Sequence, residues 1–135
     1  MPFVLDNSVV TGWYLPDQAT PYTQSIAARL ETDRAIVPAL WQLEFANVLK
    51  TACTRGKLSP DSAREIADTI ATLPIELDSG VPPGPRQLFE LAMRYKLSSY
   101  DAAYLELAMR FGLPIASQDS KLNEAAAQAG VDVLA

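Results

Sequence analysis

Four acidic residues that could carry out chemistry together are spread over nearly the whole chain: Asp6, Glu44, Asp101 and Asp119. Asp6 and Asp119 each follow a short apolar run, whereas Glu44 and Asp101 lie within helical patterns, on or beside the apolar side. An acid near the core is costly to desolvate unless a positive charge meets it. The chain has no histidine and one cysteine, so a hard cation held by oxygen ligands is the natural partner. The pattern therefore predicts a Mg²⁺ or Mn²⁺ site suited to phosphate chemistry.

The composition excludes several kinds of mechanism. Without histidine, Ser-His-Asp hydrolysis, histidine acid-base catalysis and His-ligated zinc are ruled out. Cys53 is the only cysteine, so neither a disulfide framework nor a cysteine zinc site is expected. No apolar run is long enough to span a membrane, and residues 1–15 lack the basic start and apolar core of a signal peptide. These features predict one domain over residues 1–135, in a reducing cytoplasm.

The net charge of −5 argues at first against a nucleic-acid partner. Outside the four acids named above, however, the charges nearly balance, and bound cations would neutralise the acids themselves. Lys50, Arg55 and Lys57 cluster at the end of the helical pattern that carries Glu44, where they could follow the phosphate backbone of an RNA. Basic residues are also favoured at a helix C-terminus by the dipole, so simple solvation is an equal alternative for these three.

Short apolar runs alternate with longer helical patterns along the chain. Strands are expected at Phe3–Asp6, Ala35–Val37, Ile75–Leu77, Leu113–Ala116 and Val131–Leu134. Helices are expected at Ser8–Leu15, Thr20–Asp33, Leu40–Arg55, Ser59–Leu73, Pro85–Tyr95, Ser99–Phe111 and Lys121–Ala129. This alternation predicts an α/β fold with a parallel sheet and helices on both faces. Ligands bind such sheets beyond the carboxyl ends of the strands, the edge at which Asp6 and Asp119 would both lie.

Three of the acids also have a simple local explanation. Asp6 could cap the helix that follows it, which is worth about 1 kcal/mol, although Ser8 offers an alternative cap that would leave the carboxylate free. Asp119 also precedes a helical pattern and could cap it. Glu44 falls on the rim of the apolar arc of its helix, where a glutamate is most often only solvated.

Asp101 is the least ordinary of the four acids, because it projects at the centre of an apolar stripe. The stripe comprises Tyr104, Leu105, Ala108, Met109 and Phe111. Glu106 and Arg110 fall on the opposite face, where charges are expected. Ser98 and Asp101 also have the spacing of a capping box, and an aspartate in the first turn gains from the helix dipole. A functional acid and a helix cap are therefore equal alternatives for this residue taken alone.

With these positions in hand, the chain resembles the PIN-domain ribonucleases, and most of all the VapC-type toxins of bacterial toxin–antitoxin pairs. The resemblance rests on Leu5–Val9, Glu44–Leu49, Ser99–Ala108 and Ala116–Leu122, in the family's order and spacing. Each segment is short, but together they span nearly the full chain, and no acidic position of the pattern is missing. Ser117 stands where threonine is commoner, which keeps the hydroxyl.

The resemblance implies a three-layer α/β/α sandwich with a parallel, roughly five-stranded sheet. It also implies that the acidic quartet binds Mg²⁺ or Mn²⁺ and that the enzyme cleaves RNA. Asp6 and Asp101 would be the most direct metal ligands, while Asp119 and Glu44 would complete the site or hold waters on the ion. Supporting hydrogen bonds would come from Ser8, Asn47 and Ser117. Family members usually form homodimers and are silenced by an antitoxin whose C-terminal segment wraps the groove.

The physical chemistry of such a site agrees with this expectation. Four crowded carboxylates raise one another's pKa values unless a dication is present. A bound dication would polarise the scissile phosphate and activate a water for in-line attack, which predicts a 5′-phosphate and a 3′-hydroxyl. The ribose 2′-hydroxyl is not the nucleophile, so a preference for RNA must come from shape or sugar contacts.

Other classes of protein fit part of the pattern. A haloacid-dehalogenase-type phosphatase also has an aspartate after its first strand, but it needs a second one two residues later, where this chain has Ser8. A response-regulator receiver needs an adjacent acidic pair and a lysine after a strand, which this chain lacks. The non-enzymatic alternative is a catalytically silent PIN-like module that only binds a partner. Such a module would be expected to have lost at least one of the four acids.

Overall fold

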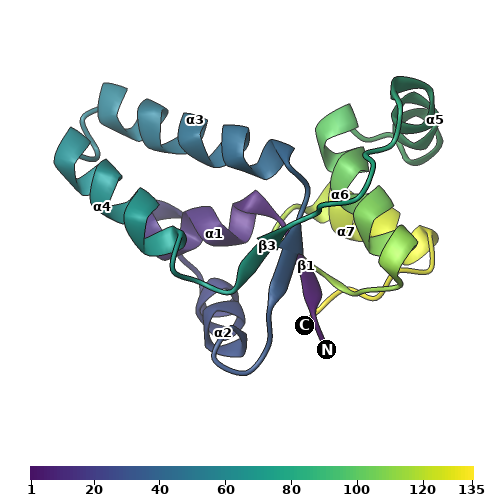
Figure 1. Cartoon of the computed structure of the whole chain (residues 1–135), viewed down its shortest axis with the longest axis horizontal. Coiled ribbons are helices and arrows are strands. Elements are labelled where there is room, and N and C mark those ends of the chain that lie inside the picture. Colours follow the sequence, from purple (N-terminus) through teal and green to yellow (C-terminus); the bar gives the residue numbers. More distant parts are fainter.

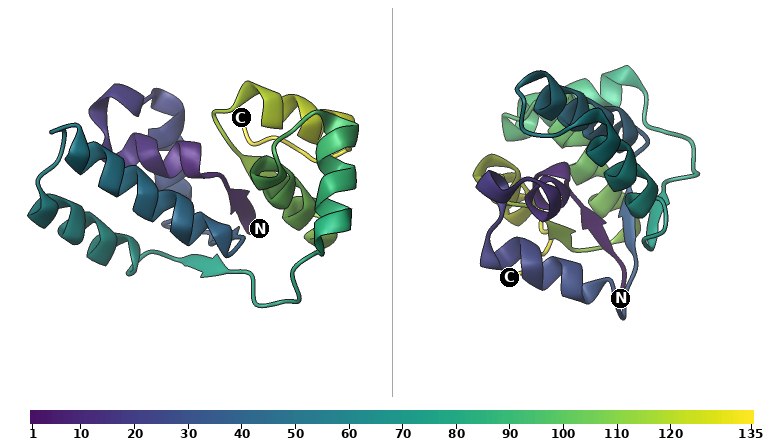
Figure 2. Two further views of the ribbon diagram at one scale, coloured as in Figure 1. Left: turned by 90° about the horizontal axis from the view of Figure 1, so that it is seen from above. Right: turned by 90° about the vertical axis from the view of Figure 1, so that its left-hand side faces the viewer.

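A computed structural model, which describes residues 1–135, contains one parallel sheet between two groups of helices (Figure 1). The strands are β1 (Phe3–Leu5), β2 (Ala35–Val37), β3 (Ile75–Leu77) and β4 (Ile115–Ala116). The helices are α1 (Asn7–Tyr14), α2 (Pro21–Arg29), α3 (Leu40–Thr54), α4 (Pro60–Ile70), α5 (Pro85–Tyr95), α6 (Ser99–Phe111) and α7 (Ser120–Gln128), with a short 3₁₀ helix η1 (Pro16–Gln18). Helices α1 to α4 lie on one side of the sheet and α5 to α7 on the other (Figures 1 and 2). The predicted α/β/α layering is therefore confirmed.

The strand order creates a defined binding edge. Neighbouring strands are arranged β3-β2-β1-β4, and all three pairs are parallel. The chain moves outward from β1 through β2 to β3 and then returns to place β4 on the other side of β1. The direction of winding thus reverses between β1 and β4. In open parallel sheets, ligands bind at the carboxyl ends of the strands beside such a reversal.

Strand β1 is the centre of the core. Phe3, Val4 and Leu5 are fully buried, as expected for a central parallel strand covered by helices on both faces. Its register places Val4 beside Ile115 of β4 on one side, and Phe3 beside Ala35 of β2 on the other. A strand held in this way on both sides gives the residue that follows it, Asp6, a fixed position.

The prediction of a fifth strand at 131–134 is wrong, because this segment forms only a single bridge to the sheet. The sheet has four strands, and of the segment predicted at 131–134 only Val133 pairs, in an isolated parallel bridge with Ile115. Two backbone hydrogen bonds of 2.9 Å join this segment to Ile115, one from Leu134 N–H and one to Asp132 C=O. Because β4 is only two residues long, it offers no further partners for a longer ladder.

Most predicted helices are confirmed within a residue or two at each end, and two end earlier. Helix α2 ends at Arg29, four residues before the predicted end, and turns follow it. Helix α4 ends at Ile70 rather than at Leu73, because the ring of Pro74 disfavours a helical backbone at the residue before it. None of the helices is both long and apolar enough to cross a membrane.

Helix α6 is buried on all sides over its middle two turns, so the predicted division into an apolar and a charged face is wrong. Every residue from Ala102 to Ala108 is buried, including Glu106, whereas Met109 and Phe111 of the predicted stripe are exposed. The helix lies against the sheet through β1 and also contacts α5 and α7. A helix enclosed by its neighbours has no solvent-exposed face, so the amphipathic pattern of its sequence does not predict which residues are exposed.

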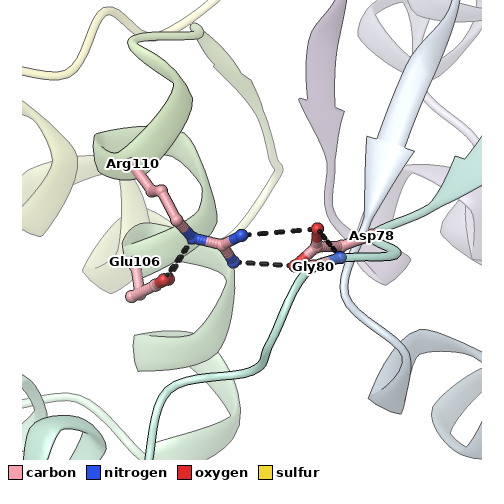
Figure 3. Close-up of polar contacts among 4 residues, drawn as sticks. All are labelled: Asp78, Gly80, Glu106 and Arg110. Atoms are coloured by element: carbon pink, nitrogen blue, oxygen red, sulfur yellow. Dashed lines mark hydrogen bonds and ion pairs between the residues drawn. The ribbon is translucent and has the colours of Figure 1, made fainter.

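The buried Glu106 is neutralised by Arg110, which also ties α6 to the loop after β3 (Figure 3). The guanidinium Nε donates to Glu106 Oε1 at 2.7 Å, and Nη2 donates to Asp78 Oδ2 at 2.7 Å. Asp78 also accepts from Gly80 N–H, and its pKa is lowered chiefly by the bonds from Arg110. This network fastens the start of the long β3–α5 connection to α6, the helix that carries Asp101.

Candidate active site

Asp6 lies at the reversal point of the sheet, directly beyond β1. Its backbone N–H donates to the carbonyl of Ala116 (3.0 Å), the last residue of β4, so the two strand ends are held side by side. The carboxylate is buried, and its Oδ2 accepts hydrogen bonds from the hydroxyls of Ser8 and Ser117, both at 2.7 Å. Burial raises the pKa of Asp6, although these two hydrogen bonds act in the opposite direction. The carboxylate does not cap α1 through its side chain.

The two serines lock the loops around Asp6. Ser8 Oγ accepts from Gln118 N–H and Ser117 Oγ accepts from Asp119 N–H, both at 2.9 Å. Each hydroxyl therefore donates to Asp6 and accepts from the β4–α7 turn, which fixes that turn against the start of α1. The alternative role of Ser8 as the cap of α1 is wrong, because its hydroxyl is engaged in these two bonds.

Asp101 faces the same edge from the first turn of α6. The capping-box spacing produces only one of the two expected bonds: Ser98 Oγ accepts from Asp101 N–H at 3.1 Å, and the carboxylate makes no hydrogen bond of its own. Burial raises the pKa of Asp101 to about 6, and the negative charges of Asp119, Asp6 and Glu44 add to this effect. The four acids predicted from the sequence thus act on one another, with Asp101 in the field of the other three.

Glu44 reaches this group from the first half of α3 and is held by Tyr104, a residue expected only in an apolar stripe. The hydroxyl of Tyr104, on α6, donates to Glu44 Oε1 at 2.6 Å. The pKa of Glu44 is raised chiefly by desolvation and also by Asp6, while the bond from Tyr104 lowers it. Because Tyr104 is fully buried, its hydroxyl needs a hydrogen-bond partner. The signal in the sequence was a tyrosine, which carries a hydroxyl, within an apolar helical pattern.

Asp119 combines the two roles considered for it. One oxygen, Oδ1, caps α7 by accepting from Lys121 N–H at 2.9 Å and Leu122 N–H at 3.3 Å. Its charge also raises the pKa values of Asp6 and Asp101, so the carboxylate belongs to the same group. The cap fixes the side chain and leaves Oδ2 without a hydrogen bond.

No basic side chain neutralises any of the four carboxylates, whereas six of the other twelve acids of the chain are ion-paired. Ion pairs are made instead by Asp17, Asp33, Asp61, Glu76, Asp78 and Glu106. A set of half-buried carboxylates with no internal cation fits a hard dication such as Mg²⁺ or Mn²⁺, whose preferred ligands are oxygens. As the side chains stand, no three acidic or cysteine groups converge closely enough to hold one ion among them.

Other predicted residues lie outside this group. Asn47 is exposed and makes no side-chain hydrogen bond, and it lines a cavity of about 230 Å³ between α1 and α3 with Arg55 and Lys57. Lys57 Nζ is paired with Asp17 at 2.6 Å. Arg55 follows Glu44 by eleven residues, about 16 Å along a helix axis at 1.5 Å per residue. Arg55 and Lys57 therefore lie away from the carboxylates, whereas Asn47 follows Glu44 by three residues on α3 and is its neighbour on the helix surface, without a hydrogen bond to it.

Tyr104→Phe is expected to lower any activity of this site about tenfold, because groups that orient metal-binding carboxylates typically have effects of that size. The loss of one hydrogen bond to a half-buried carboxylate should cost about 1 kcal/mol of unfolding free energy. Tyr14→Phe is the matched control, since the Tyr14 hydroxyl makes no hydrogen bond in the structure. Urea unfolding and divalent-dependent turnover measure the two effects; equal activity in the two variants would exclude a positioning role for Tyr104.

Comparison with known proteins agrees with this geometry. The family model of the PIN domain matches residues 3–128. The chain therefore belongs to the PIN-domain family. This confirms the resemblance inferred from its four sequence segments.

Among its relatives are two proteins called VapC ribonucleases. Ribonuclease VapC1 of Mycobacterium tuberculosis is 30% identical over 86 residues, which are 63% of this chain and 62% of that protein. Ribonuclease VapC3 of Pyrobaculum aerophilum is 26% identical over 128 residues, covering 92% of this chain and 94% of the relative. The crystal structure of PAE2754 from Pyrobaculum aerophilum has a TM-score of 0.64 at 22% identity, covering 93% of this chain and 79% of that one. The last comparison supports the fold.

Proposed function

We propose that this protein is a metal-dependent endoribonuclease and the toxin of a VapBC-type toxin–antitoxin pair. The observation that carries the proposal is the group of four carboxylates at the sheet reversal, which share one electrostatic environment and have no basic partner. Membership of the PIN-domain family and similarity to two VapC ribonucleases support RNA as the substrate. An antitoxin protein and a second copy of the chain are the partners that this proposal includes, and the cytoplasm is the compartment.

In this proposal Asp6 and Asp101 hold the ion directly, and Glu44 and Asp119 complete its surroundings. When bound, the dication would polarise the scissile phosphate and lower the pKa of a water. The protein's own groups fix the geometry: Ser8 and Ser117 hold Asp6 Oδ2, leaving its other oxygen for the ion. Tyr104 fixes Glu44 in the same way, through Oε1.

The raised pKa of Asp101 makes binding of the ion depend on pH. Without a dication, burial and mutual repulsion favour protonation of Asp101, whose pKa is about 6. At neutral pH the site therefore gains from an ion that screens its charges, and it loses affinity for that ion as the pH falls through the pKa of Asp101. The protein contributes positioning and charge complementarity rather than acid-base chemistry by histidine, which it lacks.

Asp6→Asn is expected to reduce the rate of divalent-dependent RNA cleavage by at least about a thousandfold while the protein stays folded. The amide keeps the shape of the carboxylate and can still accept hydrogen bonds from the two serines, but it provides no charge for the ion. Cleavage of total RNA with Mn²⁺ or Mg²⁺, and with EDTA as the metal-free arm, measures the change. Sequencing should find 5′-phosphate and 3′-hydroxyl ends. Wild-type protein that binds RNA but never cuts it, or an Asp6→Asn variant that cuts at the wild-type rate, would overturn the proposed activity.

A further inference from the structure

A polar cavity of about 440 Å³ lies between the C-terminal end of α5 and the outer face of α7. Figure 2 shows these two helices on the same side of the sheet, away from α1 to α4. Side chains from the end of α5 form one wall, and side chains from one face of α7 form the other. The wall residues with charges are Arg94, Lys96, Lys121 and Glu124. Three bases against one acid make the cavity cationic in a chain whose net charge is −5.

The basic groups of this cavity are free to bind an anion. Arg94, Lys96 and Lys121 make no ion pair, and Arg94 lies over the ring of Tyr95, 5.5 Å from its centroid. Carboxylates occupy the basic groups of Arg29, Arg34, Lys57, Arg64 and Arg110, and the bases outside the cavity that make no ion pair are Lys50, Arg55 and Arg86. Unpaired cations from two separate elements around one cavity form a site that can take a phosphate.

Lys96 reaches this cavity from an unusual backbone position. It ends α5 in the left-handed region, with φ 57° and ψ 47°, and no other non-glycine residue of the chain has a positive φ. The other residues with positive φ are Gly56, Gly112 and Gly130. Glycine is the ordinary choice at such a helix end, because a side chain there is strained. The chain thus keeps an amine at a position where glycine would satisfy the backbone better.

The cavity adjoins two of the carboxylates along the chain. Lys121 follows Asp119 by two residues, so their Cα atoms are at most about 7 Å apart. Lys96 precedes Asp101 by five residues, separated from it by the turn and cap that begin α6. Both lysines therefore belong to the segments that lead to Asp101 and Asp119, which makes the cavity the candidate place for a second phosphate of a strand held at the carboxylates.

We propose that the α5–α7 cavity binds a backbone phosphate of single-stranded RNA next to the scissile one, through Lys96 and Lys121 with Arg94 beside them. The inference rests on the proposed nuclease function and adds a subsite to it. Amines contact phosphate as point charges and read no bases, so the subsite sets the path of the strand and not its sequence.

The variants Lys96→Gly and Lys121→Ala test this subsite. Lys96→Gly removes the amine and relieves the backbone strain, so it should not lower the melting temperature, and weaker RNA binding could not be attributed to misfolding. Each variant is expected to weaken binding of a labelled single-stranded RNA of random sequence about three- to tenfold. The slope of log affinity against log salt should fall by about 0.7 per lost phosphate contact. In cleavage assays KM should rise with little change in kcat.

The matched control is Arg64→Ala, which removes one charge from an exposed position on α4 remote from the cavity. Unchanged RNA affinity in both lysine variants, or an equal loss in Arg64→Ala, would overturn the subsite. An acidic peptide such as polyglutamate provides the second probe, and a loss confined to that probe would also overturn it. If the wild-type protein binds RNA without cutting it, only the nuclease function is contradicted. The RNA affinities of the lysine variants, compared with those of the wild type and Arg64→Ala, then still decide whether the subsite exists. If the wild-type protein neither binds nor cuts RNA, both proposals are wrong.

Discussion

Asp101→Asn is expected to reduce RNA cleavage by at least about a thousandfold and, at the same time, to raise the melting temperature of the metal-free protein at pH 7. Burial and three neighbouring carboxylates raise the pKa of Asp101 to about 6, so its ionised form is unfavourable in the folded protein. An amide carries no charge and avoids this repulsion. Solvent screens much of the effect at a half-buried group, so we expect a gain of about 1 kcal/mol, or a few degrees.

A suitable control for this prediction is Asp68→Asn, the same chemical change at an exposed position of α4. It should alter neither cleavage nor melting temperature. Opposite changes in activity and stability at one residue are typical of a site arranged for a ligand and not for its own stability. Lower stability of metal-free Asp101→Asn, or activity equal to that of Asp68→Asn, would contradict the role given to Asp101.

The stability of the metal-free protein is expected to fall as the pH rises from about 5 to 7. The pKa values of Asp6, Glu44 and Asp101 are all raised in the folded protein. In this window the folded protein binds more protons than the unfolded chain, so raising the pH favours unfolding until the groups are ionised in both states. The carboxylates with lowered pKa values do not oppose this trend, because they are already ionised in both states there: Asp17, Asp33 and Asp78.

Mg²⁺ or Mn²⁺ should remove this pH dependence or reverse it. A dication that binds only the folded protein adds about 2.7 kcal/mol at a concentration one hundred times its Kd. It also favours the ionised carboxylates, so the added stability should be largest at pH 7 and smallest at pH 5. Thermal melts at both pH values, with metal and with EDTA, measure the difference. Parallel pH profiles in the two conditions, or no rise in melting temperature at saturating metal, would show that the carboxylates do not form a metal site.

The layered fold could be read from the sequence because its signals are local. The strands at 35–37 and 75–77 and the helices at 85–95 and 99–111 have the bounds that apolar runs, prolines and capping serines indicate. The fifth strand was overestimated because its pairing depends on the length of β4, a partner distant in sequence. The burial of Glu106 could not be predicted either, since helical periodicity does not show which helix is enclosed on every side.

The acids of the candidate site were predictable, as were the hydrogen bonds that Ser8 and Ser117 make to Asp6, but the support of Glu44 was not. Asp6 and Asp119 follow strands, so the rule for parallel sheets places them at one edge before any coordinates are known. The bond between Tyr104 and Glu44 joins residues sixty positions apart, and no local pattern indicates which acid a buried tyrosine will meet. The left-handed backbone of Lys96 is also invisible to sequence reasoning, which expects glycine or asparagine at such a helix end.

The position of a bound Mn²⁺ ion is the decisive test of the proposed metal site. Crystals of the wild-type protein grown with saturating Mn²⁺ and measured for anomalous scattering should show manganese within about 2.3 Å of a carboxylate oxygen of Asp6 and of Asp101. The same peak should be absent from Asp101→Asn crystals treated identically. Manganese bound elsewhere, or no manganese between Asp6 and Asp101 at a concentration that supports cleavage, would contradict the central claim that these carboxylates form a metal-dependent nuclease site.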